Sequence, residues 1–312
     1  MRIAVVGAGG VGGYFGGRLA QAGHDVTFIA RGEHLSAMLR EGLRVESING
    51  DFAVSPVQAT DRPDDVGAVE LIIMGVKAWQ IPEAAARLSP MLGPDTLVLP
   101  LQNGLEAAPQ LAKVVGPAAV LGGLCAIYSF VTAPGCIRHI GIDPSVTFGA
   151  LQPSQAGRLA EIQTALRQAG ITASMASDIR VPLWEKFLVL RWGVVGAVAR
   201  VPAGVLRRLP QARDMIDQAS REVLAVAKTQ GINLPADTLQ RSSALLDSLP
   251  AVATTSLQRD VMEGHPSELD AQAGALVRLG EQVGVATPLH AFVYHSLLPM
   301  ETQARGEIDG AV

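Results

Sequence analysis

Short and almost wholly apolar runs, separated by glycine-rich or amphipathic segments, make up the first part of the chain. Runs of this kind, bounded by turn residues, are typical of strands buried on both faces of a parallel sheet. They predict strands at residues 2–6, 26–30, 69–76 and 96–101. A last short strand is predicted at 172–176, and helices at 13–21 and 159–170. The pattern indicates an α/β unit with a doubly wound parallel sheet.

Two further segments have the period of antiparallel strands. Residues 43–59 contain Asn49-Gly50 between two strand-like runs, which predicts a hairpin. Residues 120–150 carry several short strand-like runs with a turn at Pro134-Gly135, and we expect them to be antiparallel edge strands.

Beyond about residue 180 the period becomes helical almost throughout. Helices are predicted at 183–200, 203–208, 210–231, 236–248, 251–263 and 267–284, with a last helix from about 288. A chain of 312 residues exceeds what one compact core usually supports. We therefore expect two domains, residues 1–180 and an all-α domain at 181–312.

The first predicted strand runs directly into Gly7-Ala8-Gly9-Gly10-Val11-Gly12, which opens a helix. In this strand-to-helix context G-x-G-x-x-G is typical of the Rossmann-type dinucleotide-binding fold. Gly7 permits a tight turn, Gly9 lets the backbone approach a pyrophosphate, and Gly12 lets the helix pack on the strand. Ala8, Gly10 and Val11 supply the rest of the loop, where helix N–H groups favour phosphate.

Arg31 follows the second strand, 24 positions after Gly7. NAD enzymes place an acidic residue near this point to bind the ribose 2′-hydroxyl, whereas a guanidinium suits the 2′-phosphate of NADP. The residue therefore favours NADP. The alternative is a solvent-facing charge at the end of a strand.

Lys77 and Asn103 follow the two later parallel strands. In open parallel sheets ligands bind outside the carboxyl ends of the strands. We expect both residues at the same crevice as the glycine loop.

The helical domain offers four candidate residues. Lys186 lies among apolar residues, so it either snorkels to solvent or is held in a cleft. Ser256 and Asp260 are four positions apart and share one helix face. Ser267 is expected to cap the next helix, which puts Glu268 in its first turn; simple complementation of the helix dipole is the alternative.

Composition and charge exclude several classes of function. The 25 basic and 29 acidic residues form no block of like charge, so we expect no nucleic-acid partner and a small-molecule substrate. The apolar stretch 188–201 is interrupted by Arg191, Gly193 and Gly196, and is too short for a membrane span. The first strand begins at Arg2 with no signal peptide before it, so we expect a cytoplasmic protein.

The remaining candidates for chemistry are the cysteines and the histidines. Cys125 and Cys136 are interpreted as reduced thiols, with a disulfide as the alternative. His139, His265 and His290 have no metal-ligand spacing, and no metal site is expected. The apolar faces of the helical domain could be buried internally or in a homodimer, and both alternatives stay open.

Taken in order, these motifs resemble the 2-dehydropantoate 2-reductase (ketopantoate reductase) family nearly end to end. The matching segments are the glycine loop with Arg31, Lys77-Ala78-Trp79-Gln80, Gln102-Asn103-Gly104, Trp184-Glu185-Lys186-Phe187, and Ser256 to Asp270. The resemblance implies NADPH-dependent reduction of a 2-keto acid to a 2-hydroxy acid, as in pantothenate biosynthesis.

The resemblance also implies the roles of individual residues. The family's catalytic lysine falls on Lys186 and its substrate-contacting carboxylate on Glu268. Asn103 and Ser256 fall on substrate-binding positions, while Asp260 and Lys77 match positions that line the site. An ammonium group can stabilise charge on a carbonyl oxygen and supply its proton.

One departure from the family concerns the substrate. Family members often carry asparagines that contact the substrate four and eight residues after the lysine, where this chain has Leu190 and Val194. We therefore expect these two side chains to form an apolar wall that faces the substrate. Three hypotheses follow: a ketopantoate reductase, a reductase of a more apolar 2-keto acid, and a non-catalytic NADP-binding sensor. The first is favoured. The presence of Lys186, Glu268 and Asn103 together argues against the sensor, because a sensor has no need of a proton donor.

Overall fold

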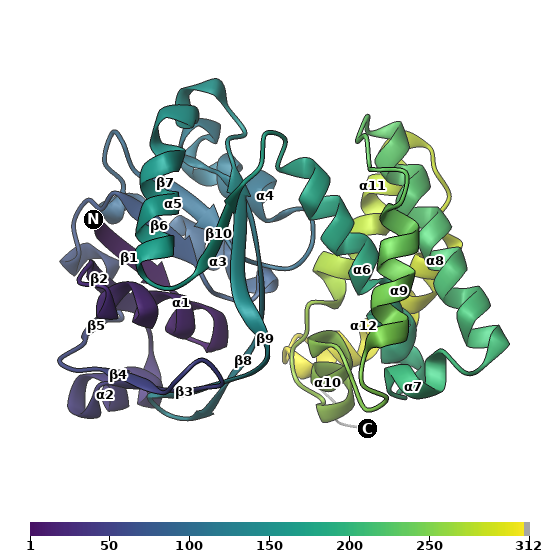
Figure 1. Ribbon diagram of the computed structural model, residues 1–312, viewed down its shortest axis with the longest axis horizontal. Coiled ribbons are helices and arrows are strands. Elements are labelled where there is room, and N and C mark those ends of the chain that lie inside the picture. The colour runs from purple at the N-terminus through teal and green to yellow at the C-terminus, as the bar shows by residue number, and fades with distance from the viewer. Residues whose placement is uncertain (309–312) are drawn as a thin grey trace. The chain divides into compact units, whose positions relative to one another are not determined.

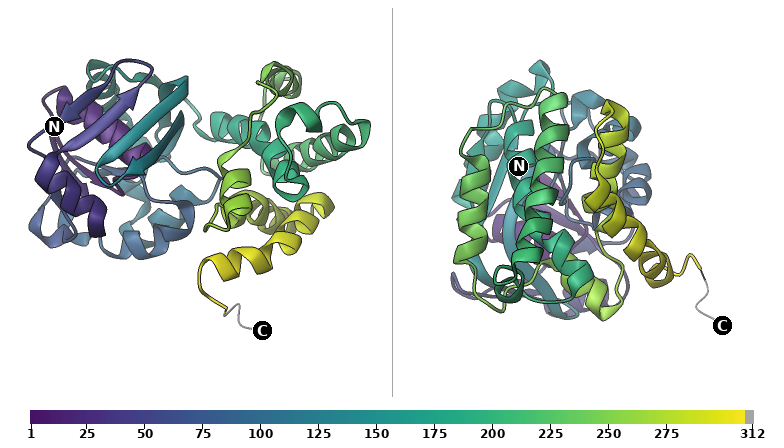
Figure 2. Two further views of the ribbon diagram at one scale, coloured as in Figure 1. Left: turned by 90° about the horizontal axis from the view of Figure 1, so that it is seen from below. Right: turned by 90° about the vertical axis from the view of Figure 1, so that its right-hand side faces the viewer.

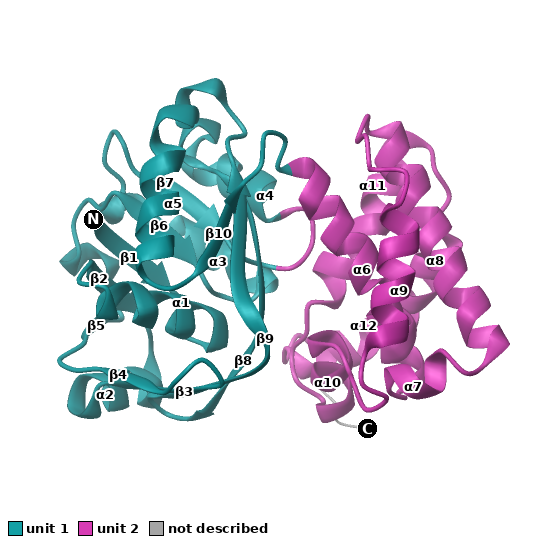
Figure 3. Ribbon diagram, in the orientation of Figure 1, with its two compact units in different colours: residues 1–102, 107–179 teal, residues 103–106, 180–312 magenta. Residues whose placement is uncertain are grey.

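The structure, a computed structural model, describes residues 1–308, which form two compact units (Figure 3). Unit 1 comprises Met1–Gln102 and Ala107–Ile179, and unit 2 comprises Asn103–Glu106 and the chain from Arg180 onward. The expected fold class is confirmed, since unit 1 contains a parallel sheet with helices and the second half of the chain is helical. The short segment 103–106 departs from the expected division, because it belongs to unit 2.

The main sheet of unit 1 is wholly parallel, with the strand order β5-β2-β1-β6-β7. Its strands are β1 (Arg2–Val6), β2 (Asp25–Ile29), β5 (Gln58–Thr60), β6 (Leu71–Met74) and β7 (Leu97–Pro100). Alternate residues of β1 enter two different hydrophobic clusters: Ile3 and Val5 one, Ala4 and Val6 the other. The strand is thus buried on both faces, which is why its sequence shows no polar alternation.

A second sheet has the order β10-β9-β3-β4, and β8 also pairs with β9. Its strands are β3 (Leu43–Ser47), β4 (Phe52–Val54), β8 (Gly122–Ala133), β9 (Cys136–Gly149) and β10 (Thr172–Met175). The antiparallel pair β3–β4 confirms the predicted hairpin.

The prediction of several short edge strands at 120–150 is wrong. The segment forms two long strands joined at Pro134-Gly135, and β9 lies inside the sheet because it also pairs in parallel with β3 and β10. Cys125 lies on β8 and Cys136 on β9, and within the described chain no disulfide joins them.

Five helices and five short 3₁₀ turns are described in unit 1 (Figure 1). The helices are α1 (Gly10–Gln21), α2 (Gly32–Glu41), α3 (Ile81–Ala86), α4 (Ala107–Val115) and α5 (Leu159–Gln168), and the 3₁₀ turns are η1 (Pro63–Asp65), η2 (Ala78–Gln80), η3 (Ser89–Met91), η4 (Pro117–Ala119) and η5 (Pro153–Arg158). Helix α1 contacts strands of both sheets, so the glycine loop at its start is fixed by the largest core of the unit.

Unit 2 is built around α6, which contacts α8, α9, α10 and α12 (Figures 1 and 2). Its helices are α6 (Arg180–Ala199), α7 (Ala203–Leu206), α8 (Pro210–Thr229), α9 (Thr238–Ser248), α10 (Ser256–Glu263), the π-helical turn η6 (Asp270–Gly274), α11 (Ala275–Val283) and α12 (Pro288–Ala304). No helix within residues 1–308 combines the length and the apolar character needed to cross a lipid bilayer.

Several helix boundaries differ from the sequence prediction, among them those of the two helices predicted at 251–263 and 267–284. Helix α10 begins at Ser256 rather than 251, because Thr255 and Gln258 form a capping box: each side chain accepts the other's backbone N–H, at 3.2 and 3.1 Å. The single helix predicted at 267–284 begins instead at Leu269 and contains the π-helical turn η6 before α11.

Arg191 fixes α6 against two neighbouring helices. Its side chain is almost fully buried, and the guanidinium donates to Ser220 of α8 and to Ser242 and Ser243 of α9. Burial lowers the pKa of Arg191 to about 10. The arginine that interrupts the apolar stretch is thus a structural link of the helical unit.

A second buried link joins α8 to the start of α12. The Glu222 carboxylate accepts hydrogen bonds from the backbone N–H groups of Leu289 and His290, and lies 2.6 Å from His290 Nδ1. Burial alone would raise the pKa of Glu222, but the bonds from His290 and Leu289 hold it below its usual value. Glu222 is therefore a capping carboxylate contributed by another helix.

We expect Glu222→Gln to destabilise unit 2 by about 1–3 kcal/mol, because a neutral amide replaces a buried charged acceptor. A lowered folded-state pKa stabilises the fold above the unfolded-state pKa, and this contribution is lost as the pH falls through the folded-state value. Thermal unfolding at pH 7 and at acid pH measures both effects: the difference in Tm between the wild type and Glu222→Gln should be smaller at acid pH. The exposed Glu281→Gln on α11 is the control. A difference in Tm that is larger at acid pH would contradict this assignment.

Candidate active site

The glycine loop of unit 1 has the geometry that its sequence predicts. Gly7 has φ +94°, and a Cβ there would lie 2.7 Å from the Val76 backbone nitrogen. A Cβ on Gly12 would lie 2.0 Å from the Gly7 carbonyl oxygen, so only glycine lets α1 pack this closely. Of the other loop residues, Ala8 is buried, Val11 is half-buried, and Gly10 packs on the backbone of Ser129 in β8.

Gly9 differs from its neighbours, because nothing lies within 4 Å of the place where its Cβ would stand. The backbone of the loop is therefore open at this point, and the first turn of α1 contains no acidic residue. Open backbone at the N-terminus of a 12-residue helix suits the pyrophosphate of a dinucleotide. The residues present thus fit the cofactor that the sequence implies.

His34 supports this loop, although no sequence pattern singles it out. Its Nδ1 accepts the backbone N–H of Gly135 at 3.1 Å, so the other ring nitrogen carries the hydrogen in the neutral ring. That nitrogen lies 2.9 Å from the Ala8 carbonyl oxygen and donates to it. His34 on α2 thus ties the loop to the turn between β8 and β9.

Arg31 is the N-terminal boundary residue of α2, two residues after β2 ends. Its side chain is 72% exposed, and its Nη1 lies 3.9 Å from Glu83. An ion pair this long and exposed contributes little, so it competes weakly with a phosphate.

Lys77 is half-buried, and its backbone N–H donates to the Gln80 side chain at 3.1 Å. The buried Gln102 reaches the same turn: its amide nitrogen donates to the carbonyls of Met74 and Val76 at 2.8 and 2.9 Å. Gln102 therefore holds the end of β6, just before Lys77. The sequence motif drew attention to Asn103 and missed this role of its neighbour.

Asn103 and Glu268 form the central polar pair of unit 2. The Asn103 amide donates to Glu268 Oε2 at 2.8 Å, although 165 positions separate the two residues. Asn103 was expected with the first domain, but the close approach of Gly104 to Ala271 and the ion pair of Glu106 with Arg278 hold its segment in unit 2.

Glu268 is only 6% exposed, so the alternative of a carboxylate on the surface is wrong. It also lies just before the helix rather than in its first turn, since the helix begins at Leu269 and the Glu268 carbonyl accepts the N–H of Gln272. Ser267, the expected cap, accepts the Leu269 N–H at 3.1 Å.

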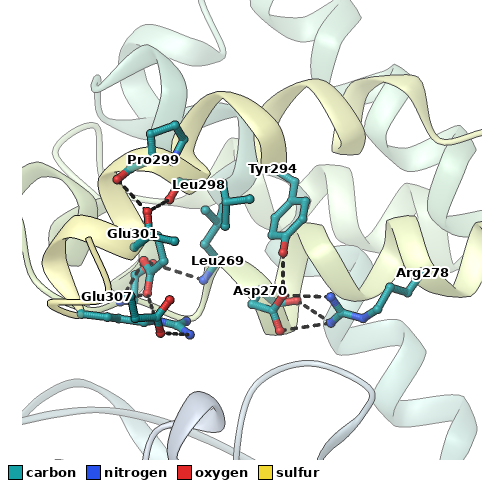
Figure 4. Close-up of polar contacts among 11 residues, drawn as sticks. Leu269, Asp270, Arg278, Tyr294, Leu298, Pro299, Glu301 and Glu307 are labelled. Carbon is teal, nitrogen blue, oxygen red and sulfur yellow. Dashed lines mark hydrogen bonds and ion pairs between the residues drawn. The ribbon is translucent and has the colours of Figure 1, made fainter. Parts of the chain in front are cut away.

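The residues on either side of Glu268 are anchored by side chains from α11 and α12 (Figure 4). Glu301 of α12 accepts both the backbone N–H and the hydroxyl of Ser267. Asp270 accepts from Arg278 of α11 at 2.8 Å and from the Tyr294 hydroxyl at 2.9 Å. Burial opposes ionisation of Asp270, but the bonds from Arg278 and Tyr294 leave its pKa below the usual value.

Lys186 lies in the second turn of α6 and is half-buried. Its neighbours Trp184, Phe187 and Leu188 are buried in one hydrophobic cluster, which fixes this part of the helix. The residue is therefore carried by a rigid element.

Ser256 and Asp260 both lie on α10 and are half-buried, as the sequence predicted for a shared helix. A Cβ on Gly193 would lie 2.5 Å from the Thr255 side chain, so glycine lets α6 meet the start of α10 closely. Lys186 and Gly193 are seven residues apart and thus on one face of α6. The start of α10, with Ser256, therefore packs on the face of α6 that carries Lys186.

Leu190 and Val194 differ in their surroundings. Leu190 is half-buried and lies one turn after Lys186 on the same face. Val194 is 2% exposed and packs with Leu257, Val261 and Leu269 in a core cluster of unit 2. The expectation that both residues line the substrate is wrong for Val194, because helix packing turns it into the core.

Comparison with known proteins identifies the relatives of this chain. Residues 3–153 match the family model "Ketopantoate reductase PanE/ApbA", and residues 178–301 match "Ketopantoate reductase PanE/ApbA C terminal". The 2-dehydropantoate 2-reductase of Halobacterium salinarum is 30% identical, over 93% of this chain and 95% of the relative. A crystal structure of a ketopantoate reductase from Ralstonia eutropha JMP134 is 29% identical with TM-score 0.87, and covers 98% of this chain and 100% of its own.

The same fold occurs in a D-mandelate dehydrogenase solved with NADH and anilino(oxo)acetate (23% identity, TM-score 0.89, 98% of this chain and 99% of that one). The fold alone therefore selects neither a substrate nor a cofactor.

The family matches and the fold define the class: the protein is an oxidoreductase that acts on a CH–OH group. Within that class, the chain belongs to the ketopantoate reductase (PanE/ApbA) family.

Proposed function

We propose that this protein uses NADPH to reduce 2-dehydropantoate to pantoate. The observation that carries the proposal is the 2.8 Å pair of Asn103 and Glu268, which joins two of the expected substrate residues within the unit that also contains Lys186. A buried carboxylate beside an amide is suited to a hydroxylated ligand, because both groups form directional hydrogen bonds.

The glycine loop, Arg31 and Lys77 of unit 1 would hold NADPH, which would supply the hydride for C2 of the keto acid. The carbonyl oxygen of the substrate takes a proton to become the hydroxyl of the product. Lys186 is the proposed donor of that proton, since its ammonium group also stabilises the negative charge that develops on the oxygen. The lysine then regains a proton from solvent.

The other residues hold the substrate in line. Glu268 accepts a hydrogen bond from Asn103, and its carboxylate is also the proposed acceptor for the substrate hydroxyl, because a carboxylate can accept several hydrogen bonds. The Ser256 hydroxyl donates to the substrate carboxylate, and Asp260 lines the site one turn further along α10. Asn103, carried by the loop after β7, is also a candidate contact of the cofactor.

The preference for NADPH rests on Arg31. Its exposed guanidinium can pair with the 2′-phosphate, and Lys77 and the glycine loop bind the rest of the dinucleotide.

Leu190 supports a second candidate, a reductase for a 2-keto acid with an apolar side chain. It is the one residue of the expected apolar wall that is not in the core, and an apolar group cannot pair with a substrate hydroxyl. The two candidates differ in which acid the enzyme prefers, 2-dehydropantoate or 2-oxoisovalerate.

Leu190→Asn should raise the preference for 2-dehydropantoate over 2-oxoisovalerate by about two- to twelvefold, the value of one hydrogen bond of about 0.5–1.5 kcal/mol. The ratio of the two kcat/KM values measures this preference. Leu239→Asn on α9, where the side chain is 37% exposed, is the matched control. A ratio that stays constant or falls would show that Leu190 does not face the substrate.

Steady-state oxidation of NADPH with both acids tests the proposal itself. A larger kcat/KM for 2-dehydropantoate supports it, whereas a larger value for 2-oxoisovalerate favours the second candidate. Activity with neither acid would overturn both.

A further inference from the structure

The Asn103–Glu268 pair depends on two backbone segments that are distant in sequence and lie outside helix interiors. Asn103 begins the four-residue segment 103–106, and Glu268 precedes the helix that starts at Leu269. A small shift of either segment would change how the amide and the carboxylate meet. Something must therefore fix the spacing between the two segments.

Arg278 of α11 bonds to both segments at once. Its Nη2 and Nε donate to the Glu106 carboxylate at 2.5 and 3.2 Å. Its Nη1 donates to Asp270 Oδ1 at 2.8 Å, and its Nη2 also reaches the Asp270 backbone oxygen at 3.1 Å. Glu106 is three residues after Asn103, and Asp270 is two residues after Glu268.

The chemistry of these contacts favours a fixed geometry. A guanidinium is planar and holds its five N–H donors in a rigid fork, so two carboxylates bound to it keep a set separation. The group is partly shielded, since the side chains of Arg278, Glu106 and Asp270 are 36, 19 and 39% exposed. Tyr294 fixes Asp270 further, as its hydroxyl points to the same carboxylate from α12 (Figure 4).

The backbone adds a second restraint on the same two segments. A Cβ on Gly104, which has φ +99°, would lie 2.4 Å from the Ala271 carbonyl oxygen. The two segments thus contact each other directly at Gly104, and Arg278 bonds to the first segment two residues further on, at Glu106.

We infer that Arg278 is a positioning residue, which sets the Asn103–Glu268 pair by bridging Glu106 and Asp270 and so governs recognition of the substrate hydroxyl. This inference rests on the proposed function. Arg278 does not touch the substrate; its effect passes through the two segments that it ties together.

The test compares Arg278→Gln with the wild type on 2-dehydropantoate and on 2-oxoisovalerate, which lacks the hydroxymethyl group. We expect kcat/KM for 2-dehydropantoate to fall at least tenfold, chiefly through KM, while the value for 2-oxoisovalerate changes less than threefold. The kcat/KM of Arg278→Lys for 2-dehydropantoate should fall between those of the wild type and Arg278→Gln, because a single ammonium keeps the charge but cannot hold both carboxylates. If Arg278 only stabilised the fold, its replacement would lower kcat/KM for both acids by the same factor.

Arg213→Gln is the matched control. Arg213 is also 36% exposed and joins α8 to Asp247 of α9, but neither of these helices carries Asn103 or Glu268. Its two kcat/KM values should stay at the wild-type level.

Glu106→Gln is a second variant for the case that Arg278→Gln does not fold. It weakens the bonds between Arg278 and residue 106 and leaves the bonds between Arg278 and Asp270 intact. It should shift the substrate ratio in the same direction by a smaller factor. In a folded variant, an equal loss of kcat/KM for both acids, or no loss for either, would overturn this inference and leave the proposed function standing. A wild type that reduces neither acid, or does not favour 2-dehydropantoate, would instead overturn the proposed function and the inference with it.

Discussion

Lys186→Ala should lower kcat by roughly 100- to 10,000-fold while the protein stays folded, because a positioned proton donor typically contributes a factor of this size. The change corresponds to about 3–5.5 kcal/mol of activation free energy. Affinity for NADPH should persist, since Lys186 is not among the proposed cofactor residues, most of which (Gly7 to Gly12, Arg31 and Lys77) lie in unit 1. Steady-state kinetics and fluorescence titration with NADPH measure the two quantities separately.

Lys228→Ala is the control for this variant. Lys228 lies in the last turn of α8 in the same unit and is exposed, so its loss should leave kcat unchanged. An unaltered rate in Lys186→Ala would show that this lysine only carries its charge to solvent. Lys77 would then be the first residue to examine as the proton donor.

Arg31→Ala should raise KM for NADPH about tenfold to a hundredfold and leave KM for NADH nearly unchanged. Only NADPH carries the 2′-phosphate, and a hydrogen bond between charged groups contributes about 1.5–3 kcal/mol. The side chain is exposed and its partner Glu83 is 3.9 Å away, so its removal should not disturb the fold.

Arg40→Ala on the same helix α2 is the control, since that side chain is 67% exposed and also pairs with a glutamate. Its KM values for both cofactors should match the wild type. If Arg31→Ala raised KM for NADPH and for NADH by the same factor, the preference for NADPH would have to come from another residue.

The features that could be predicted from the sequence are those that neighbours along the chain determine. The glycine loop follows from sterics within ten residues, because a Cβ on Gly12 would collide with the Gly7 carbonyl. The parallel strands and most helices follow from the period of their apolar residues.

The features that could not be predicted depend on contacts between distant segments. The inner position of β9 comes from its pairing with β3 and β10, which no local period encodes. The placement of Asn103 in unit 2 depends on Glu268 and Arg278, more than 160 positions away. Val194 shares a helix with Lys186, and only the packing of α6 on its neighbours shows that it faces the core.

The same limit applies to the supports of the site. His34 and Gln102 bind backbone carbonyls at the glycine loop and at the end of β6, and neither belongs to a pattern that marks such a role. Side chains that position a site through backbone oxygens leave no spacing rule to detect, because almost any turn can offer those oxygens.

The transfer of deuterium from NADPH labelled at C4 of the nicotinamide tests the central claim most directly. The wild-type protein, incubated with 2-dehydropantoate and the labelled cofactor of either C4 configuration, should form pantoate in step with NADPH oxidation. With one of the two labelled cofactors the deuterium should appear at C2 of the product. Oxidation without label at C2 from either cofactor, or no oxidation with 2-dehydropantoate, would contradict the account of a direct hydride transfer to this keto acid.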